Sequence, residues 1–125
     1  MNELLKRRII SFKYAGQGVV TLFKTQPNAV IHLAILLIVV GFGWWLQISV
    51  VEWLMLMLTF AMVLVAEAFN TALEFLTDLV SPNYHELAGK TKDVAAGAVL
   101  IAAFFAIIIG ILIFLPKIIN LLNVQ

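Results

Sequence analysis

The chain has 125 residues, of which 63% are hydrophobic and only 12% charged, and it contains no cysteine. This composition excludes an ordinary soluble domain, in which about a quarter of the residues are charged. The absence of cysteine excludes disulfides, a thiol nucleophile and a cysteine metal site. The net charge is +1, and no basic surface with interleaved aromatic residues points to nucleic acid. Since a chain this short encloses only a small site, we expect it to self-associate.

The first 25 residues are expected to form an amphipathic helix on the membrane surface. They carry five basic residues and a single acid, with apolar residues interspersed. In such a helix the cations lie among lipid headgroups and the apolar side chains lie below them. The basic residues are Lys6, Arg7, Arg8, Lys13 and Lys24.

Three apolar segments follow, at residues 29–46, 50–80 and 94–115. Each is long enough for a hydrocarbon core about 30 Å thick, which needs roughly 20 helical residues. We therefore predict an all-α integral membrane protein in which residues 1–125 form a single domain. Residues 81–93 are expected to be a loop after a second helix that projects beyond the membrane. His32 is the only strongly polar residue of the first segment, and we expect it to have a structural or hydrogen-bonding role.

The distribution of Lys and Arg predicts the orientation in the membrane. The basic N-terminal segment precedes the first span, and Lys90 and Lys92 lie between the second and third. Because cytoplasmic loops are enriched in Lys and Arg, the N-terminus and the second connection are expected in the cytoplasm. The C-terminus is then expected outside.

A polar stripe on the second span is the main candidate for function. Glu67, Asn70, Glu74 and Asp78 lie on one helix face, at about 100° per residue. Three carboxylates close together repel each other and are costly near lipid, so a metal ion, cations or a polar ligand must compensate them. Counted from Val50, Glu67 lies about 25 Å along the helix, near the inner membrane boundary.

Lys92 and Asp93 stand at the start of the third span, at the level of the stripe. Carboxylates with a lysine at such a boundary suit Mg-nucleotide chemistry, and they equally suit ion pairs at a helix end. The sequence Gly89-Lys90-Thr91 is not a P-loop, because the earlier glycine and the preceding strand are missing.

Two motifs in order resemble the prokaryotic diacylglycerol kinase family, which also includes undecaprenol kinases of Gram-positive bacteria. The first is Glu-x-x-Asn-x-x-x-Glu at residues 67–74, and the second is Lys-Asp at 92–93 within the run 84–96. The resemblance covers essentially the whole chain. It implies a homotrimeric kinase of the bacterial inner membrane, with active sites shared between subunits, ATP as co-substrate and Mg²⁺ as cofactor.

The resemblance also implies roles for individual residues. Glu67 matches the catalytic base that acts on the lipid hydroxyl, and Glu74 matches a ligand of metal and nucleotide. The implied substrate-binding positions are Glu67, Asn70, Ala96, where the family has a serine, and Arg7, with Arg8 as the alternative. The implied ATP-binding positions are Tyr14, Gln26, Glu74, Asn83, Tyr84, His85, Lys92 and Asp93. Gln26 stands where the family commonly has a second metal-binding glutamate, so the metal is expected to be held more weakly or differently.

The resulting hypothesis is an ATP-dependent lipid kinase, with diacylglycerol as the favoured substrate and phosphatidic acid as the product. Undecaprenol is the alternative lipid. Two other classes stay open: a small proton-coupled transporter with an essential carboxylate, and a structural partner subunit whose polar stripe holds helices together. Phosphorylation of lipid by the purified protein distinguishes all three.

Overall fold

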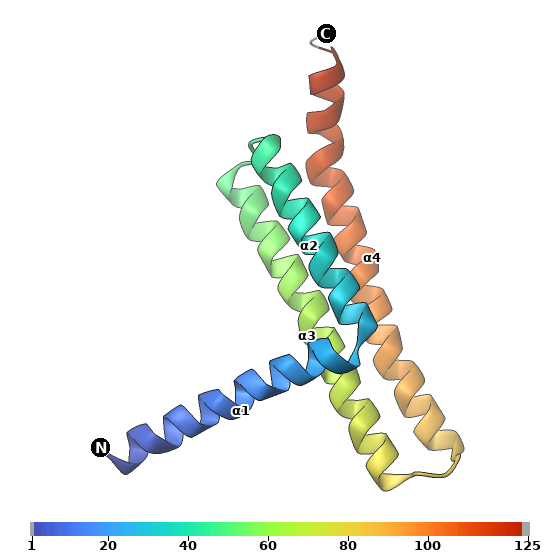
Figure 1. The fold of residues 1–125 in the computed structure, drawn as a ribbon. Helices are drawn as coiled ribbons and strands as arrows, with labels where there is room; N and C mark the ends of the chain where they lie inside the picture. The colour runs from blue at the N-terminus through green and yellow to red at the C-terminus, as the bar shows by residue number, and fades with distance from the viewer. Residues whose placement is uncertain (1, 124–125) are drawn as a thin grey trace.

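The computed structural model describes residues 2–123, which form four helices. These are α1 (Glu3–Thr25), α2 (Pro27–Trp45), α3 (Val50–Val80) and α4 (Glu86–Asn123). Helices α2, α3 and α4 form a bundle, and α1 projects from it at a steep angle (Figure 1). By length and composition α2, α3 and α4 are each able to cross a membrane. The all-helical prediction with three candidate membrane spans is confirmed.

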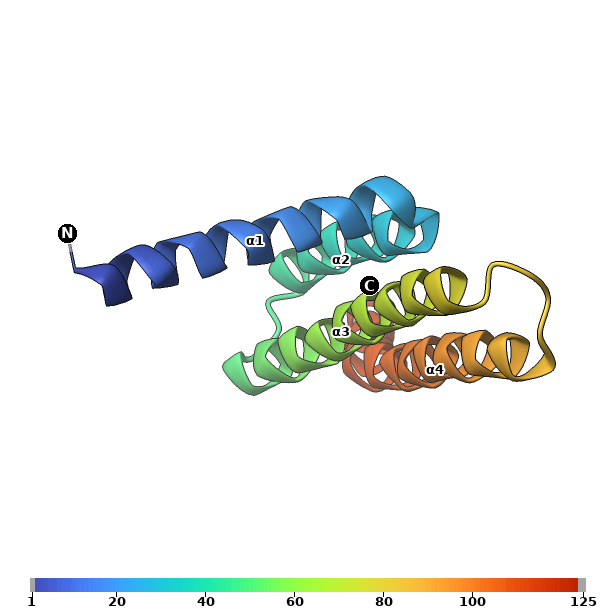
Figure 2. The same ribbon diagram turned by 90° about the horizontal axis from the view of Figure 1, so that it is seen from below.

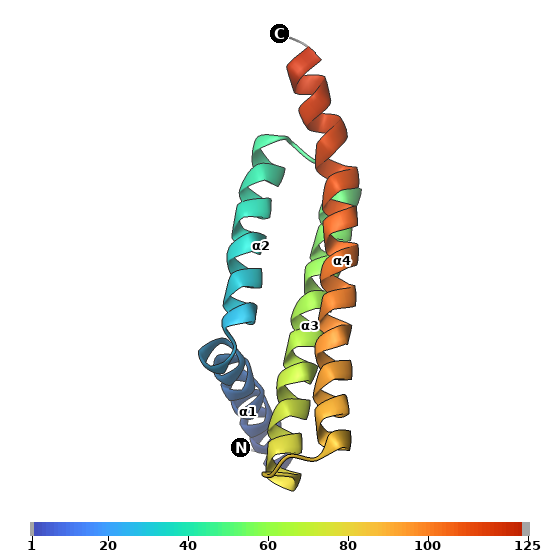
Figure 3. The same ribbon diagram turned by 90° about the vertical axis from the view of Figure 1, so that its right-hand side faces the viewer.

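Helices α3 and α4 form the most extensive contact of the bundle. They run side by side along their length, with α2 beside the pair (Figure 3). Seen from below, α1 and α2 lie on the same side of the α3–α4 pair (Figure 2). A small apolar core lies at the end of the bundle that holds the α2–α3 turn, and its buried members are Ile48, Leu56 and Ile113.

A proline separates α1 from α2. Pro27 is the first residue of α2, a position where its missing N–H leaves no helical hydrogen bond unmade. The residue before a proline is driven out of the helical region, and Gln26 has φ −115° and ψ 102°. The backbone N–H of Gln26 still closes α1 by donating to Leu22 O at 2.9 Å. The chain therefore changes direction at Gln26, which directs this side chain toward α3.

The turn from α2 to α3 is a Schellman motif. Gln47 has φ 48°, in the left-handed region, and its N–H donates to Trp44 O at 3.3 Å. The N–H of Ile48 donates to Gly43 O at 3.1 Å, so the last carbonyls of α2 are satisfied. The Ile48 side chain then folds back over Gly43.

Gly43 is a site where a side chain would meet the neighbouring helix. A Cβ atom there would lie 2.8 Å from Trp53 Cη2 and 3.0 Å from Ile48 Cδ1, whereas one at Gly41 would meet nothing within 4 Å. We expect Gly43→Ala to destabilise the bundle by about 1–3 kcal/mol, because the Trp53 ring must move. Gly41→Ala, the same change in the same helix, is expected to be neutral or slightly stabilising. Reversible unfolding in detergent micelles measures both, and equal stabilities would contradict the expectation.

A capping box starts α3 and an ion pair joins it to α4. Ser49 Oγ accepts from the N–H of Glu52, and the Glu52 carboxylate accepts from the N–H of Ser49. Lys117 Nζ of α4 lies 3.1 Å from Glu52 Oε2. These contacts tie α3 to α4 at the end of the bundle opposite the α3–α4 connection.

The start of α4 differs from the expectation that residues 81–93 form a loop. The helix begins at Glu86, and the connection is reduced to residues 81–85. His85 Nδ1 accepts from the N–H of Leu87 at 3.2 Å, and Lys90 Nζ lies 2.6 Å from Glu86 Oε1 one turn earlier. Hydropathy marks where a chain enters the membrane, but caps and pairs of this kind determine where a helix begins. Lys92 and Asp93 therefore lie within a helix.

Candidate active site

Glu67 is the most deeply buried charged residue among residues 2–123. Its exposed fraction is 1%, and the Thr71 hydroxyl donates to its backbone carbonyl at 2.9 Å. His32 Nε2, from α2, lies 3.2 Å from Glu67 Oε1. This separation allows charge pairing, but the two atoms are not aligned as a hydrogen bond, and Oε1 has no other partner in the part of the chain described. Glu67 thus keeps a free acceptor in a buried position.

A cavity of about 300 Å³ opens beside Glu67, between α2, α3 and α4. The Oδ1 atom of Asn70, which also lines it, is buried and unpaired. A buried acceptor without a partner costs about 1–3 kcal/mol, so a ligand that brings a donor is favoured here. The cavity is lined by Asn28, His32, Glu67, Asn70, Ala96, Val99, Leu100 and Ala103. Three of the expected substrate-binding positions, Glu67, Asn70 and Ala96, therefore line one space.

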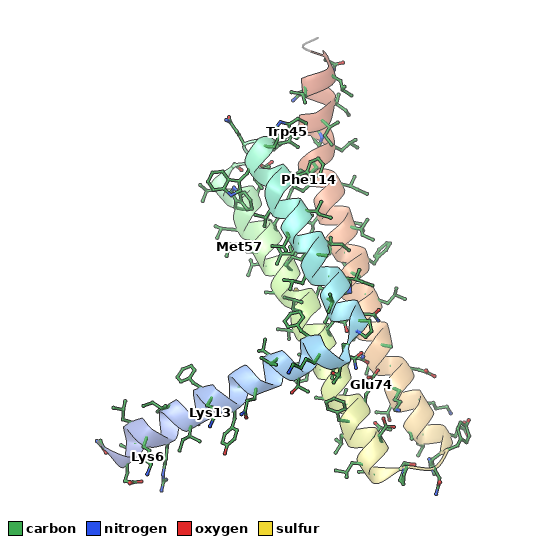
Figure 4. All side chains as sticks on the ribbon, in the orientation of Figure 1. Lys6, Lys13, Trp45, Met57, Glu74 and Phe114 are labelled. Atoms are coloured by element: carbon green, nitrogen blue, oxygen red, sulfur yellow. The ribbon has the colours of Figure 1, made fainter. Side chains whose placement is uncertain are left out.

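A second cluster lies one to two turns further along α3, around Glu74. Gln26 Nε2 donates to Glu74 Oε2 at 2.9 Å, and Asn70 Nδ2 donates to Glu74 Oε1 at 3.1 Å. Glu74 lies where the junction of α1 and α2 meets α3 (Figure 4). Because Asn70 lines the cavity and also donates to Glu74, it links the Glu67 site to the Glu74 cluster.

The Glu74 cluster offers one carboxylate and one amide to a metal ion. Among residues 2–123, no three His, Cys, Asp or Glu side chains are grouped to hold a metal ion by themselves. Mg²⁺ is usually held in nucleotide sites by one or two carboxylates together with phosphate oxygens. Glu74 would supply one such carboxylate, and the Gln26 amide, which now presents Nε2 to Glu74, would have to turn to present its neutral oxygen.

Lys92 approaches the polar stripe from α4. Its Nζ lies 2.5 Å from Asp78 Oδ1, and Asp78 follows Glu74 by one helical turn. Both side chains are partly exposed, and an exposed ion pair contributes only about 0–1 kcal/mol. Little stability would therefore be lost if this ion pair were broken.

The other expected ATP-binding residues do not contact Glu67 or Glu74 within the described part of one chain. Tyr84 is 93% exposed, Asp93 and Asn83 are exposed, and His85 caps α4. Tyr14 lies on the projecting part of α1, as do the expected substrate-binding residues Arg7 and Arg8, in the part marked by Lys6 and Lys13 in Figure 4. Within one chain, therefore, Gln26 and Asn70 contact Glu74, and Lys92 contacts Asp78 on the same stripe. The other expected ATP-binding residues lie apart from these groups.

Two polar residues of the cavity were not among the candidates from sequence, namely Asn28 and His32. They lie one turn apart on α2 and are the polar residues nearest its start. A structural or hydrogen-bonding role was expected for His32, and the structure places its Nε2 atom beside the buried Glu67 carboxylate without an aligned hydrogen bond. The feature of the sequence that could have identified His32 as a site residue is its position as a lone polar residue in an apolar segment.

An apolar cleft of about 220 Å³ adjoins the cavity, since His32 and Ala103 line both. The only polar side chains that line this cleft are those of His32 and Thr59, and the Thr59 hydroxyl already donates to Met55 O. The other lining residues are apolar or glycine, and they come from α2, α3 and α4. The cleft therefore offers an almost entirely apolar surface that leads to the cavity beside Glu67.

Comparison with known proteins finds similarity to one family of lipid kinases. The model of the family described as prokaryotic diacylglycerol kinase matches residues 13–114. The chain is 40% identical over 116 residues to an undecaprenol kinase of Bacillus subtilis, covering 93% of this chain and 94% of that protein. It is 42% identical over 115 residues to a diacylglycerol kinase of Synechocystis sp., covering 91% of this chain and 66% of that protein. A diacylglycerol kinase of Escherichia coli is 37% identical over 76 residues, 61% of this chain and 62% of that protein.

Proposed function

Because the chain belongs to the prokaryotic diacylglycerol kinase family, we propose that it transfers the γ-phosphoryl group of ATP to the hydroxyl group of a membrane lipid. The observation that carries this proposal is the buried Glu67 carboxylate with a free acceptor, in a cavity that continues into an apolar cleft. A lipid alcohol brings both the donor and the hydrocarbon chain that this arrangement accommodates.

In the proposed reaction Glu67 accepts the proton of the lipid hydroxyl. The lipid oxygen then attacks the γ-phosphorus, the bond to the bridging oxygen of the β-phosphate breaks, and ADP leaves. Glu74, with Gln26, would hold Mg²⁺, which when bound neutralises phosphate charge. The Lys92 ammonium group stabilises the charge that develops on the transferred group. Transfer is direct, so no phosphorylated form of the protein is expected.

The proposal places the protein as a multi-pass protein of the bacterial inner membrane, with the N-terminus and the α3–α4 connection in the cytoplasm. The five cations of α1 then lie at the headgroups of the inner leaflet, which agrees with the bias of Lys and Arg toward cytoplasmic segments. In this orientation Glu74 and Lys92 face the compartment that contains ATP.

The functional unit is proposed to be a homotrimer. In the described part of one chain, the Glu67 cavity is not lined by Asp93, Asn83, Tyr84 or any residue of α1. An active site shared between neighbouring copies brings these separate parts together. The proposal thus accounts for polar residues that a single copy leaves exposed.

Diacylglycerol, the lipid expected from the sequence, and undecaprenol are both candidates, and we propose undecaprenol because the cleft has few polar groups. Diacylglycerol carries two ester groups that accept hydrogen bonds near its hydroxyl. Of the polar groups that line the cleft, Thr59 donates within its own helix and His32 faces Glu67. An alcohol with a single hydrocarbon chain leaves no ester acceptor unmatched. The similarity to the undecaprenol kinase, which extends over nearly its full length, supports the same choice.

An assay of both lipids in one preparation tests the proposal. Purified protein in lipid vesicles, supplied with MgATP, is expected to phosphorylate undecaprenol with a higher kcat/KM than diacylglycerol. A higher value for diacylglycerol would retain the kinase and reverse the choice of lipid. No lipid phosphate from either alcohol, with proton uptake under a pH gradient instead, would favour the transporter. Neither activity would favour a structural subunit.

Gln26 offers a direct test of the metal site. Restoring a second carboxylate by Gln26→Glu is expected to lower the Mg²⁺ concentration needed for half-maximal activity, by about tenfold, because a neutral oxygen is replaced by a charged one. The new carboxylate also faces Glu74, so Mg²⁺ is expected to raise the thermal stability of this variant more than that of the wild type. Identical Mg²⁺ dependence in the two proteins would show that Gln26 is not a ligand.

A further inference from the structure

His32 is a polar residue of the cavity to which the proposed mechanism assigns no task. Its Nε2 atom lies 3.2 Å from Glu67 Oε1, and the imidazole is about one-fifth exposed. In the described residues 2–123, it is the only side chain with a polar atom in contact with the Glu67 carboxylate. The contact joins α2 to α3 at the point where the cavity meets the apolar cleft.

The other residues around the carboxylate do not replace this contact. Asn70 donates its amide to Glu74, and the Asn28 amide makes no hydrogen bond to Glu67 Oε1 within residues 2–123. The α4 residues that line the cavity carry no side-chain donor, namely Ala96, Val99, Leu100 and Ala103. An imidazole nitrogen can carry a proton and a carboxylate oxygen can accept a hydrogen bond, so the two facing groups are chemically matched. His32 is therefore placed to donate to Glu67 Oε1 when the two atoms come into alignment.

We propose that His32 is a positioning residue that fixes the Glu67 carboxylate for proton transfer from the lipid hydroxyl, an inference that rests on the proposed kinase function. A glutamate side chain has several rotatable bonds, and a donor from a separate helix restricts the carboxylate to one orientation. The pair is within contact distance but not aligned as a hydrogen bond. Catalytic hydrogen bonds of this kind commonly tighten only when substrate is bound.

The first test compares two substitutions of His32. His32→Leu keeps an apolar side chain in the bundle but removes the donor, and it is expected to lower kcat by about 100-fold, as small misplacements of a catalytic group do. The KM for ATP is expected to stay unchanged, because His32 lies at the lipid end of the site. His32→Gln retains an N–H donor and is expected to recover much of the lost kcat. Thermal unfolding of the purified variants in detergent micelles verifies that all of them are folded.

The second test places His32→Leu in a Glu67→Gln background. If His32 acts through Glu67, the double variant is expected to be no slower than Glu67→Gln alone. A merely structural His32 would lower the residual rate by the same factor in both backgrounds, and that result would overturn the assignment. Wild-type kcat in His32→Leu would overturn it as well, while leaving the kinase proposal intact. A wild-type protein that phosphorylates neither lipid would overturn both.

Discussion

Replacement of Glu67 by Gln is expected to lower kcat for lipid phosphorylation by about 10²–10⁴-fold, the range that a positioned general base contributes. The amide has nearly the same shape as the carboxylate, so the cavity and the contact with His32 are retained. It cannot accept the proton of the lipid hydroxyl. Initial rates at saturating ATP and lipid measure the effect, and the KM for ATP is expected to change little.

Glu52→Gln is the matched control for Glu67→Gln. It also removes one carboxylate from α3, but at the far end of the helix, where a glutamine still completes the capping box with Ser49. Its activity is expected to equal that of the wild type. Substantial residual activity in Glu67→Gln, with normal folding and assembly, would contradict the role of Glu67 as the base.

Replacement of Glu74 by Ala is expected to lower kcat/KM for MgATP by about 100- to 1000-fold. Glu74 is the only carboxylate of its cluster, and a bound metal contributes several kcal/mol to phosphoryl transfer. Since Gln26 and Asn70 both donate to this carboxylate, its removal also releases the contact between the α1–α2 junction and α3. The defect is expected to decrease at high Mg²⁺ concentration, which titration of the rate with Mg²⁺ measures.

Glu86→Ala serves as the control for Glu74→Ala. Glu86 is an exposed acid that pairs with Lys90 on the same helix and takes no part in the Glu74 cluster. Its kcat/KM for MgATP is expected to equal that of the wild type. If Glu74→Ala retained the wild-type dependence on Mg²⁺ and ATP, the metal would have to be held elsewhere.

The polar stripe shows what sequence periodicity can and cannot predict. Helical spacing places Glu67, Asn70 and Glu74 on one face of α3, and the structure has them there. The sequence did not show how differently they are buried: Glu67 is 1% exposed, whereas Asp78 is exposed. Burial depends on which helices pack against each turn of α3, and periodicity within one helix contains no information about its neighbours.

Contacts between residues on different helices could likewise not be predicted from the sequence. Gln26 was a candidate ligand, but its hydrogen bond to Glu74 requires the change of chain direction that Pro27 imposes. His32 was recognised as unusual, and its pairing with Glu67 depends on how α2 lies along α3. The earlier start of α4 has a local cause, the cap formed by His85, which hydropathy does not detect.

The central claim is that Glu67 accepts a proton from a lipid hydroxyl while the γ-phosphoryl group of ATP is transferred to that lipid. The most direct measurement uses ATP labelled in its γ-phosphate, with the wild type and Glu67→Gln in vesicles that contain undecaprenol or diacylglycerol. We predict that the wild type transfers label to the lipid alcohol, and that Glu67→Gln transfers almost none while still binding ATP. Label that appears on no lipid, or that is transferred equally well by Glu67→Gln, would contradict the account.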